Sequence, residues 1–137
     1  MGGTSMRSTG NGSRRRRILV VDDEPAFAEL MADFFSGLPG SPSVTVAGNG
    51  LAALDAVHRE MPDVVLLDLK MPVMNGLDVM KRMHEVDPTL PILVISGTDS
   101  RMANQAFRAG AFGYVPKPTN LRYVEHLVEE AVARRRT

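Results

Sequence analysis

The chain has 137 residues, of which 44% are hydrophobic and 23% are charged, a composition typical of a single globular domain. The absence of cysteine excludes disulfide scaffolds, thiolate metal sites and a cysteine nucleophile. The 16 basic and 16 acidic residues cancel, and no apolar run approaches the ~20 residues that span a bilayer, so we expect a cytoplasmic protein without membrane contact.

A disordered basic tail is expected at residues 1–16, because Gly, Ser and Thr dominate this segment and apolar residues are scarce. One folded domain is expected at residues 17–134, followed by a basic tail at residues 135–137. The segment from Ile18 to Ala133 carries eight basic and all 16 acidic residues, hence a formal charge of −8. The arginine runs lie at the two ends. Such runs are usually solvated, and no DNA-reading motif accompanies them, so nucleic-acid binding is not directly indicated.

Five short β-branched or aliphatic runs, each bounded by turn residues, are predicted strands. They are residues 18–21, 44–46, 64–67, 92–95 and 112–115. A longer segment with an apolar helical period follows each run. These predicted helices begin at Pro25, at Asn49, at Asn75–Gly76, at Asp99 or Ser100, and at Thr119–Asn120.

The alternation of strands and helices predicts an α/β fold, a doubly wound five-stranded parallel sheet with five helices. A Rossmann-type dinucleotide fold is disfavoured, because no G-x-G-x-x-G motif follows the first predicted strand. The flavodoxin-like strand order 2-1-3-4-5 is therefore the better prediction.

Polar side chains follow four of the predicted strands, at the sheet edge where open α/β folds bind ligands. Asp22, Asp23 and Glu24 follow the first strand and Asp68 the third, while Ser96 ends the fourth and Lys117 follows the fifth. Gathered carboxylates repel one another unless a cation neutralises them, and oxygen ligands alone favour Mg²⁺. Asp68 stands alone after a central strand, so it is the best nucleophile for attack on phosphorus.

The segments that carry these residues resemble the receiver domains of two-component response regulators, in particular chemotaxis-regulator-like ones. The matching motifs are LVVDDEP at 19–25, VLLDLKMP at 65–72 with Gly76, ISG at 95–97, and KP at 117–118. They occur in the right order over residues 17–134, nearly the whole predicted domain.

The resemblance implies a phosphoacceptor and a metal site at the first and third strands. Asp68 would accept the phosphoryl group. Mg²⁺ would be bound by Asp22, Asp23, Asp68 and the backbone carbonyl of Lys70.

The resemblance also implies a switch around the phosphoryl group. Ser96 would turn its hydroxyl toward that group, Lys117 would pair with it, and Tyr114 would turn inward when Ser96 moves. The Lys117–Pro118 peptide would be cis. Access to the phosphate and the lifetime of the phosphoryl group would depend on Gly97, Thr98 and Lys70.

The expected function is a signalling domain that accepts a phosphoryl group from a sensor histidine kinase or a histidine phosphotransfer protein, with Mg²⁺ required. Phosphorylation would change how a face made by the fourth helix, fifth strand and fifth helix binds a downstream protein. The family also allows a phosphorylation-dependent homodimer. We expect no enzyme activity beyond slow self-dephosphorylation.

Two organisations of the whole protein stay open. Few residues follow Ala133, which favours a stand-alone regulator. The rival is an excised N-terminal receiver of a multidomain response regulator or a hybrid kinase. An aspartate-based phosphohydrolase is a weaker alternative, because such enzymes need a second aspartate where this chain has Lys70.

Overall fold

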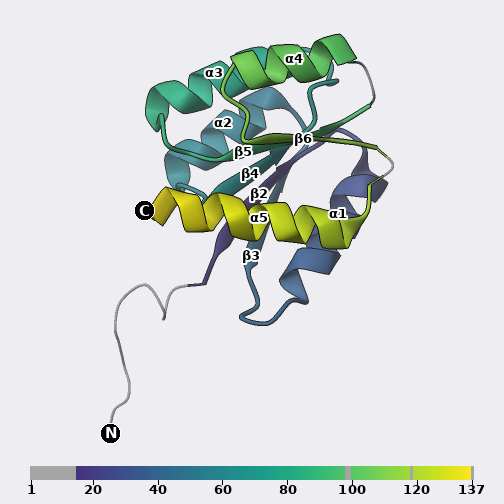
Figure 1. Ribbon diagram of the computed structural model, residues 1–137, viewed down its shortest axis with the longest axis vertical. Helices are drawn as coiled ribbons and strands as arrows, with labels where there is room; N and C mark the ends of the chain where they lie inside the picture. The colour runs from purple at the N-terminus through teal and green to yellow at the C-terminus, as the bar shows by residue number, and fades with distance from the viewer. Residues whose placement is uncertain (1–14, 98–99, 118, 137) are drawn as a thin grey trace, which may run out of the picture.

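Figure 1 shows a computed structural model of the chain, which describes residues 15–97, 100–117 and 119–136. The central element is a sheet of five parallel strands in the spatial order β3-β2-β4-β5-β6. The strands are β2 (Arg17–Val21), β3 (Ser43–Ala47), β4 (Val64–Leu67), β5 (Ile92–Ser96) and β6 (Gly113–Pro116). The predicted flavodoxin-like order is confirmed, and each strand lies within one residue of its predicted bounds.

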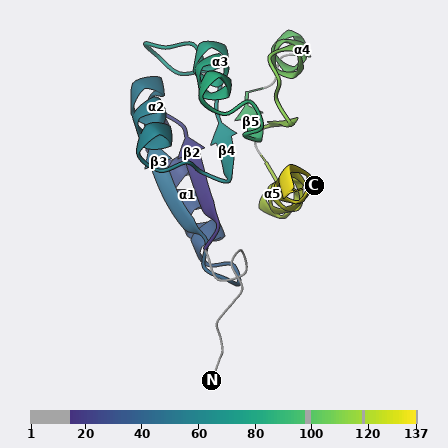
Figure 2. The same ribbon diagram turned by 90° about the vertical axis from the view of Figure 1, so that its left-hand side faces the viewer.

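Five helices cover both faces of the sheet. They are α1 (Pro25–Ser36), α2 (Gly50–Arg59), α3 (Gly76–Val86), α4 (Ser100–Arg108) and α5 (Leu121–Arg136). Buried residues of α1 and α5 pack on one face, and those of α2, α3 and α4 pack on the other. Figure 1 shows the same division, with α1 and α5 on one side of the strands, and Figure 2 shows α5 apart from α2, α3 and α4. None of the helices within the described residues is long and apolar enough to cross a membrane.

The helix starts follow from local hydrogen bonding. The side chain of Asn49 accepts a hydrogen bond of 2.8 Å from the backbone N–H of Ala52, and Asn75 accepts one of 2.8 Å from Leu77. Both contacts satisfy an N–H group that the first helical turn leaves unpaired. Pro25 begins α1, where its missing N–H is not needed.

The central strands hold the site rigidly, because they are buried on both sides. All residues of β4 and β5 are buried, and each fully buried aliphatic side chain contributes roughly 1.5–3 kcal/mol. The chain after β4 is fixed by a close approach of α3. A Cβ atom at Gly76 would lie only 2.5 Å from the Cα of Leu69, so only glycine fits here.

The arginine-rich ends are more ordered than a solvated tail. Helix α5 extends to Arg136, so Arg135 and Arg136 belong to the helix rather than to the predicted C-terminal tail. Arg135 forms an ion pair with Asp87 and donates to the carbonyl of Pro62 at 3.3 Å. These partners lie in loops at the amino-terminal edge of the sheet, and they extend α5 past the predicted boundary.

The N-terminal arginines make similar contacts where they fall within the described residues. Arg15 donates to the carbonyl of Ser41 at 2.7 Å, and Arg16 pairs with Glu129 of α5 at 2.6 Å. Residues 1–14 of the predicted tail lie outside the described residues. Arg16 therefore links the chain just before β2 to α5.

Candidate functional site

Asp68 lies at the carboxyl end of β4, and only 5% of its surface is exposed. Its Oδ1 atom accepts two hydrogen bonds, from Ser96 Oγ at 2.7 Å and from the backbone N–H of Lys70 at 3.0 Å. Its Oδ2 atom lies 3.4 Å from Lys117 Nζ, a long contact. One carboxylate oxygen is thus fixed, while the other is held weakly.

Lys117 follows β6, and its backbone N–H donates to the carbonyl of Ser96 at 2.8 Å. The ammonium lies 2.8 Å from Asp22 Oδ2 and 2.7 Å from Glu24 Oε1. Burial opposes this positive charge, but the hydrogen bonds to Asp22 and Glu24 outweigh burial and raise the pKa of Lys117 above its ordinary value of 10.5. Lys117 is therefore a permanent cation in this site.

Asp22 is almost completely enclosed, with 3% of its surface exposed. Burial raises the pKa of Asp22 above its ordinary value, and the opposing hydrogen bonds from Lys117 and the backbone of Glu24 do not cancel this effect. The fold therefore disfavours the charged form of this carboxylate relative to water. A further cation beside Asp22 would favour that form.

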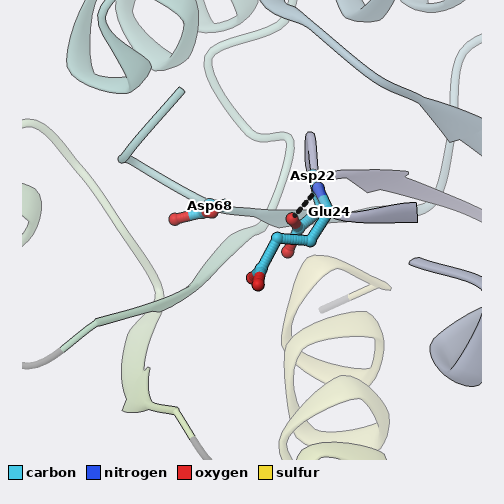
Figure 3. A group of neighbouring side chains, drawn as sticks. All are labelled: Asp22, Glu24 and Asp68. Carbon is cyan, nitrogen blue, oxygen red and sulfur yellow. Dashed lines mark hydrogen bonds between the residues drawn. The ribbon is translucent and has the colours of Figure 1, made fainter. Parts of the chain in front are cut away.

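The carboxylates of Asp22, Glu24 and Asp68 form one group, with an oxygen from each residue within 4.8 Å of the others. Figure 3 shows Asp22 and Glu24, which follow β2, beside Asp68, which follows β4. One ammonium faces three carboxylates, which leaves a formal charge of −2. Oxygen ligands and an excess of negative charge fit a hard divalent cation such as Mg²⁺.

The predicted site residues are only partly members of this group. Asp23 is exposed and lies outside it, although it stands between two members in the sequence. The side chain of Lys70 covers Gly97, because a Cβ atom at Gly97 would lie 3.3 Å from Lys70 Nζ. Thr98 and the predicted cis peptide at Pro118 lie outside the described residues.

Glu24 is a site residue for which the sequence predicted a place at the sheet edge but no role. It follows the acidic pair directly and precedes Pro25, so its position in the LVVDDEP motif was a usable signal. Its contact with Lys117 joins residues 93 positions apart. Only the folded sheet brings them together.

Tyr114 of β6 is connected to the loop after β5. Its hydroxyl donates a hydrogen bond of 2.5 Å to the carbonyl of Gly97, which follows Ser96 directly. The ring is partly buried against the core that α4 covers. Tyr114 thus contacts the residue next to the other predicted switch residue, Ser96.

A family model described as the response regulator receiver domain matches residues 18–129. The chain belongs to this family. Receiver domains are signalling domains of two-component systems, and a phosphorylatable aspartate and an acidic Mg²⁺ pocket are typical of them.

Individual relatives agree with this assignment. The chain is 40% identical over 112 residues to the probable transcriptional regulatory protein TcrX of Mycobacterium tuberculosis, covering 78% of this chain and 45% of that protein. It is 37% identical over 106 residues to a protein-glutamate methylesterase/protein-glutamine glutaminase of Desulfotalea psychrophila, covering 74% of this chain and 29% of that protein. A crystal structure of NtrX from Brucella abortus in complex with ADP matches with a TM-score of 0.83 and 28% identity, over 90% of this chain and 28% of that one. This receiver domain spans less than half the length of each of these relatives.

Proposed function

We propose that Asp68 of this receiver domain accepts a phosphoryl group from a sensor histidine kinase or a histidine phosphotransfer protein. The arrangement of the Asp68 carboxylate is the main support. Ser96 and the Lys70 backbone hold Oδ1, which leaves Oδ2 as the oxygen with only a long contact to Lys117. Oδ2 is therefore the attacking atom.

The transfer balances as a displacement at phosphorus. A lone pair of Asp68 Oδ2 forms the new O–P bond while the P–N bond of the donor phosphohistidine breaks, and the departing imidazole nitrogen keeps the bonding pair. The product is an acyl phosphate. The ammonium of Lys117, 3.4 Å from Oδ2, is placed to neutralise negative charge on the transferred oxygens.

The group of carboxylates that includes Asp22 and Asp68 is the proposed binding site for Mg²⁺. Asp22 and Asp68 would hold the ion, with Asp23 and the backbone carbonyl of Lys70 as the further ligands that family membership implies. When bound, Mg²⁺ supplies positive charge next to the phosphoryl oxygens. The charge of Asp22 would be favoured by the ion, because burial disfavours that charge and Lys117 does not fully offset this effect.

The switch begins at Ser96. Its hydroxyl donates to Asp68 Oδ1 and would donate to a phosphoryl oxygen instead once Asp68 is phosphorylated. Tyr114 donates a hydrogen bond to the carbonyl of Gly97, the residue after Ser96. A shift of this segment would therefore also move β6 and α4. The surface formed by α4, β6 and α5 would then change its affinity for a downstream protein.

The function of the whole protein depends on what the receiver domain controls. One relative is a probable transcriptional regulatory protein and another is a methylesterase, and both are longer than this chain. We propose that this chain regulates a partner protein or a further domain and is not itself an enzyme beyond slow self-dephosphorylation. A phosphorylation-dependent homodimer is one form that such regulation takes.

The proposal is tested with beryllofluoride, a stable mimic of the phosphoryl group, at saturating Mg²⁺. NMR shifts are expected at Ser96, Gly97 and Tyr114 in the wild type. They should be lost in Asp68→Asn and kept in Asp33→Asn, which removes the same charge from an exposed position of α1. Equal shifts in Asp68→Asn and the wild type would refute the assignment.

A further inference from the structure

We propose that Glu24 is a positioning residue for Lys117. It holds the ammonium in the unphosphorylated protein and competes with the phosphoryl group for it, which lowers the affinity of the site for that group. The proposal rests on phosphoryl acceptance by Asp68 and adds a residue that tunes this reaction.

The distances around Lys117 place its ammonium nearer to Glu24 than to Asp68. Nζ lies 2.7 Å from Glu24, 2.8 Å from Asp22 and 3.4 Å from Asp68. An ammonium has three N–H donors, so the two short contacts commit two of them. The phosphoacceptor receives only the longest contact.

The local structure of Glu24 supports a specific attraction to Lys117. Glu24 is the N-cap residue of α1, and its side chain makes no capping hydrogen bond. A carboxylate at this position is normally favoured by the unpaired N–H groups and the dipole of the helix. Here the side chain extends to Lys117 instead, while its backbone N–H donates to Asp22 Oδ1 at 2.9 Å (Figure 3).

Exposure separates the two close partners of Lys117. The side chain of Glu24 is 64% exposed, whereas that of Asp22 is 3% exposed. Glu24 can therefore release the ammonium and return to water with little loss of hydration. Asp22 is enclosed and keeps its contact, so Glu24 is the partner that Lys117 exchanges.

Phe27 limits where the ammonium can go. Lys117 Nζ lies 4.4 Å from the centroid of the Phe27 ring, which attracts the cation on the α1 side. Only 16% of the Lys117 side chain is exposed. Release from Glu24 is thus expected to end in a short shift toward Asp68 rather than in withdrawal to solvent.

A phosphoryl group on Asp68 would bring additional negative charge beside Glu24. An oxygen of Glu24 already lies within 4.8 Å of an oxygen of Asp68. Lys117 must then leave Glu24 for the new group, so neutralising Glu24 should favour the phosphoryl-bound state. We expect Glu24→Gln to raise the affinity for beryllofluoride about three- to fivefold, because one partner of the lost ion pair is exposed.

The test measures beryllofluoride affinity by NMR titration of the full chain at saturating Mg²⁺. The wild type is compared with Glu24→Gln and with the matched control Glu29→Gln. Lys117→Gln is compared with the double variant that carries both Glu24→Gln and Lys117→Gln. Glu29 is an exposed glutamate of the same helix, so its substitution removes the same charge. We expect the gain in Glu24→Gln alone, and no gain in the Lys117→Gln background. Melting temperatures report separately on stability.

Three results would overturn the role of Glu24. Equal beryllofluoride affinities for Glu24→Gln and Glu29→Gln would show that Glu24 has no such role. A gain that persists without Lys117 would show direct repulsion instead of competition for the ammonium. A loss of Mg²⁺ affinity as large as that of Asp22→Asn would make Glu24 a metal ligand. Failure of the proposed function looks different, because beryllofluoride would then also shift the spectrum of Asp68→Asn.

Discussion

Ser96 Oγ donates a 2.7 Å hydrogen bond to Asp68 Oδ1, although the two residues lie at the ends of different strands. Both residues are buried, so the hydroxyl is aimed at the carboxylate without competition from bulk water. The contact sets which oxygen of Asp68 is held and which remains for attack. It also places a hydrogen-bond donor beside the position of a future phosphoryl group.

Removing this hydroxyl should weaken the phosphoryl-bound state. Ser96→Ala is expected to lower the affinity for beryllofluoride about tenfold, as one hydrogen bond to a charged group is lost. Ser96→Thr keeps the hydroxyl and should stay near the wild-type affinity. Titration at saturating Mg²⁺ measures both, and a normal affinity for Ser96→Ala would show that the hydroxyl does not contact the bound group.

Neutralising Asp22 should stabilise the metal-free protein and weaken Mg²⁺ binding. Burial raises the pKa of this carboxyl, so the fold carries a cost for its charge that asparagine avoids. We expect Asp22→Asn to raise the free energy of unfolding in EDTA. The extra stability of Asp22→Asn over the wild type should shrink as the pH falls, because the wild-type carboxyl then takes up a proton. Denaturant unfolding with and without Mg²⁺ measures both effects, and an unchanged Mg²⁺ affinity would contradict the site.

The hydroxyl of Tyr114 should transmit the signal without binding the phosphoryl group. Tyr114→Phe loses the 2.5 Å hydrogen bond to the Gly97 carbonyl. Its affinity for beryllofluoride should stay near that of the wild type, while the NMR shifts in α4 become smaller. Tyr123→Phe, at a half-exposed tyrosine of α5, is the control. Full-sized shifts in Tyr114→Phe would exclude coupling through the hydroxyl.

Asp87 should stabilise the attachment of α5 in a pH-dependent way. Burial alone would raise the pKa of Asp87, but two hydrogen bonds from Thr89 and the charges of Arg135 and His84 outweigh it and lower the pKa below 3.8. A lowered pKa in the folded state means that this stability is present above pH 3.8 and is lost as the pH falls through the folded value.

Asp87→Asn is therefore expected to lower the free energy of unfolding at pH 7 by about 1–2 kcal/mol. The difference from the wild type should disappear in acid. Asp55→Asn breaks an exposed ion pair with Arg59 and should change the stability by less than about 0.5 kcal/mol. A constant difference between Asp87→Asn and the wild type across the acid range would rule out the titration of this carboxyl as its cause.

The sequence predicts the sheet and much of the site for a simple reason. β-branched runs mark the strands, and the carboxyl ends of parallel strands share one edge, so the convergence of Asp22, Asp68, Ser96 and Lys117 follows from topology. Their geometric convergence is confirmed, while their chemical roles stay predictions.

Contacts that depend on side-chain direction were not predictable in this way. Glu24 makes no capping hydrogen bond at α1 and contacts Lys117, whereas Asp23 beside it is exposed and lies outside the acidic group. Arg135 belongs to α5 because it pairs with Asp87, 48 positions away. Asp87 lies at the edge of the sheet opposite the acidic group. The sequence of an arginine run, or of an acidic run, does not show whether its side chains are solvated or form ion pairs.

Mapping of the modified residue shows whether Asp68 carries the phosphoryl group. The chain is treated with acetyl phosphate and Mg²⁺, trapped with borohydride, which reduces an acyl phosphate, and digested for mass spectrometry. The predicted result is modification at Asp68 alone, absent without Mg²⁺ and absent in Asp68→Asn. Modification at another residue, or equal labelling of Asp68→Asn, would show that Asp68 is not the phosphoacceptor.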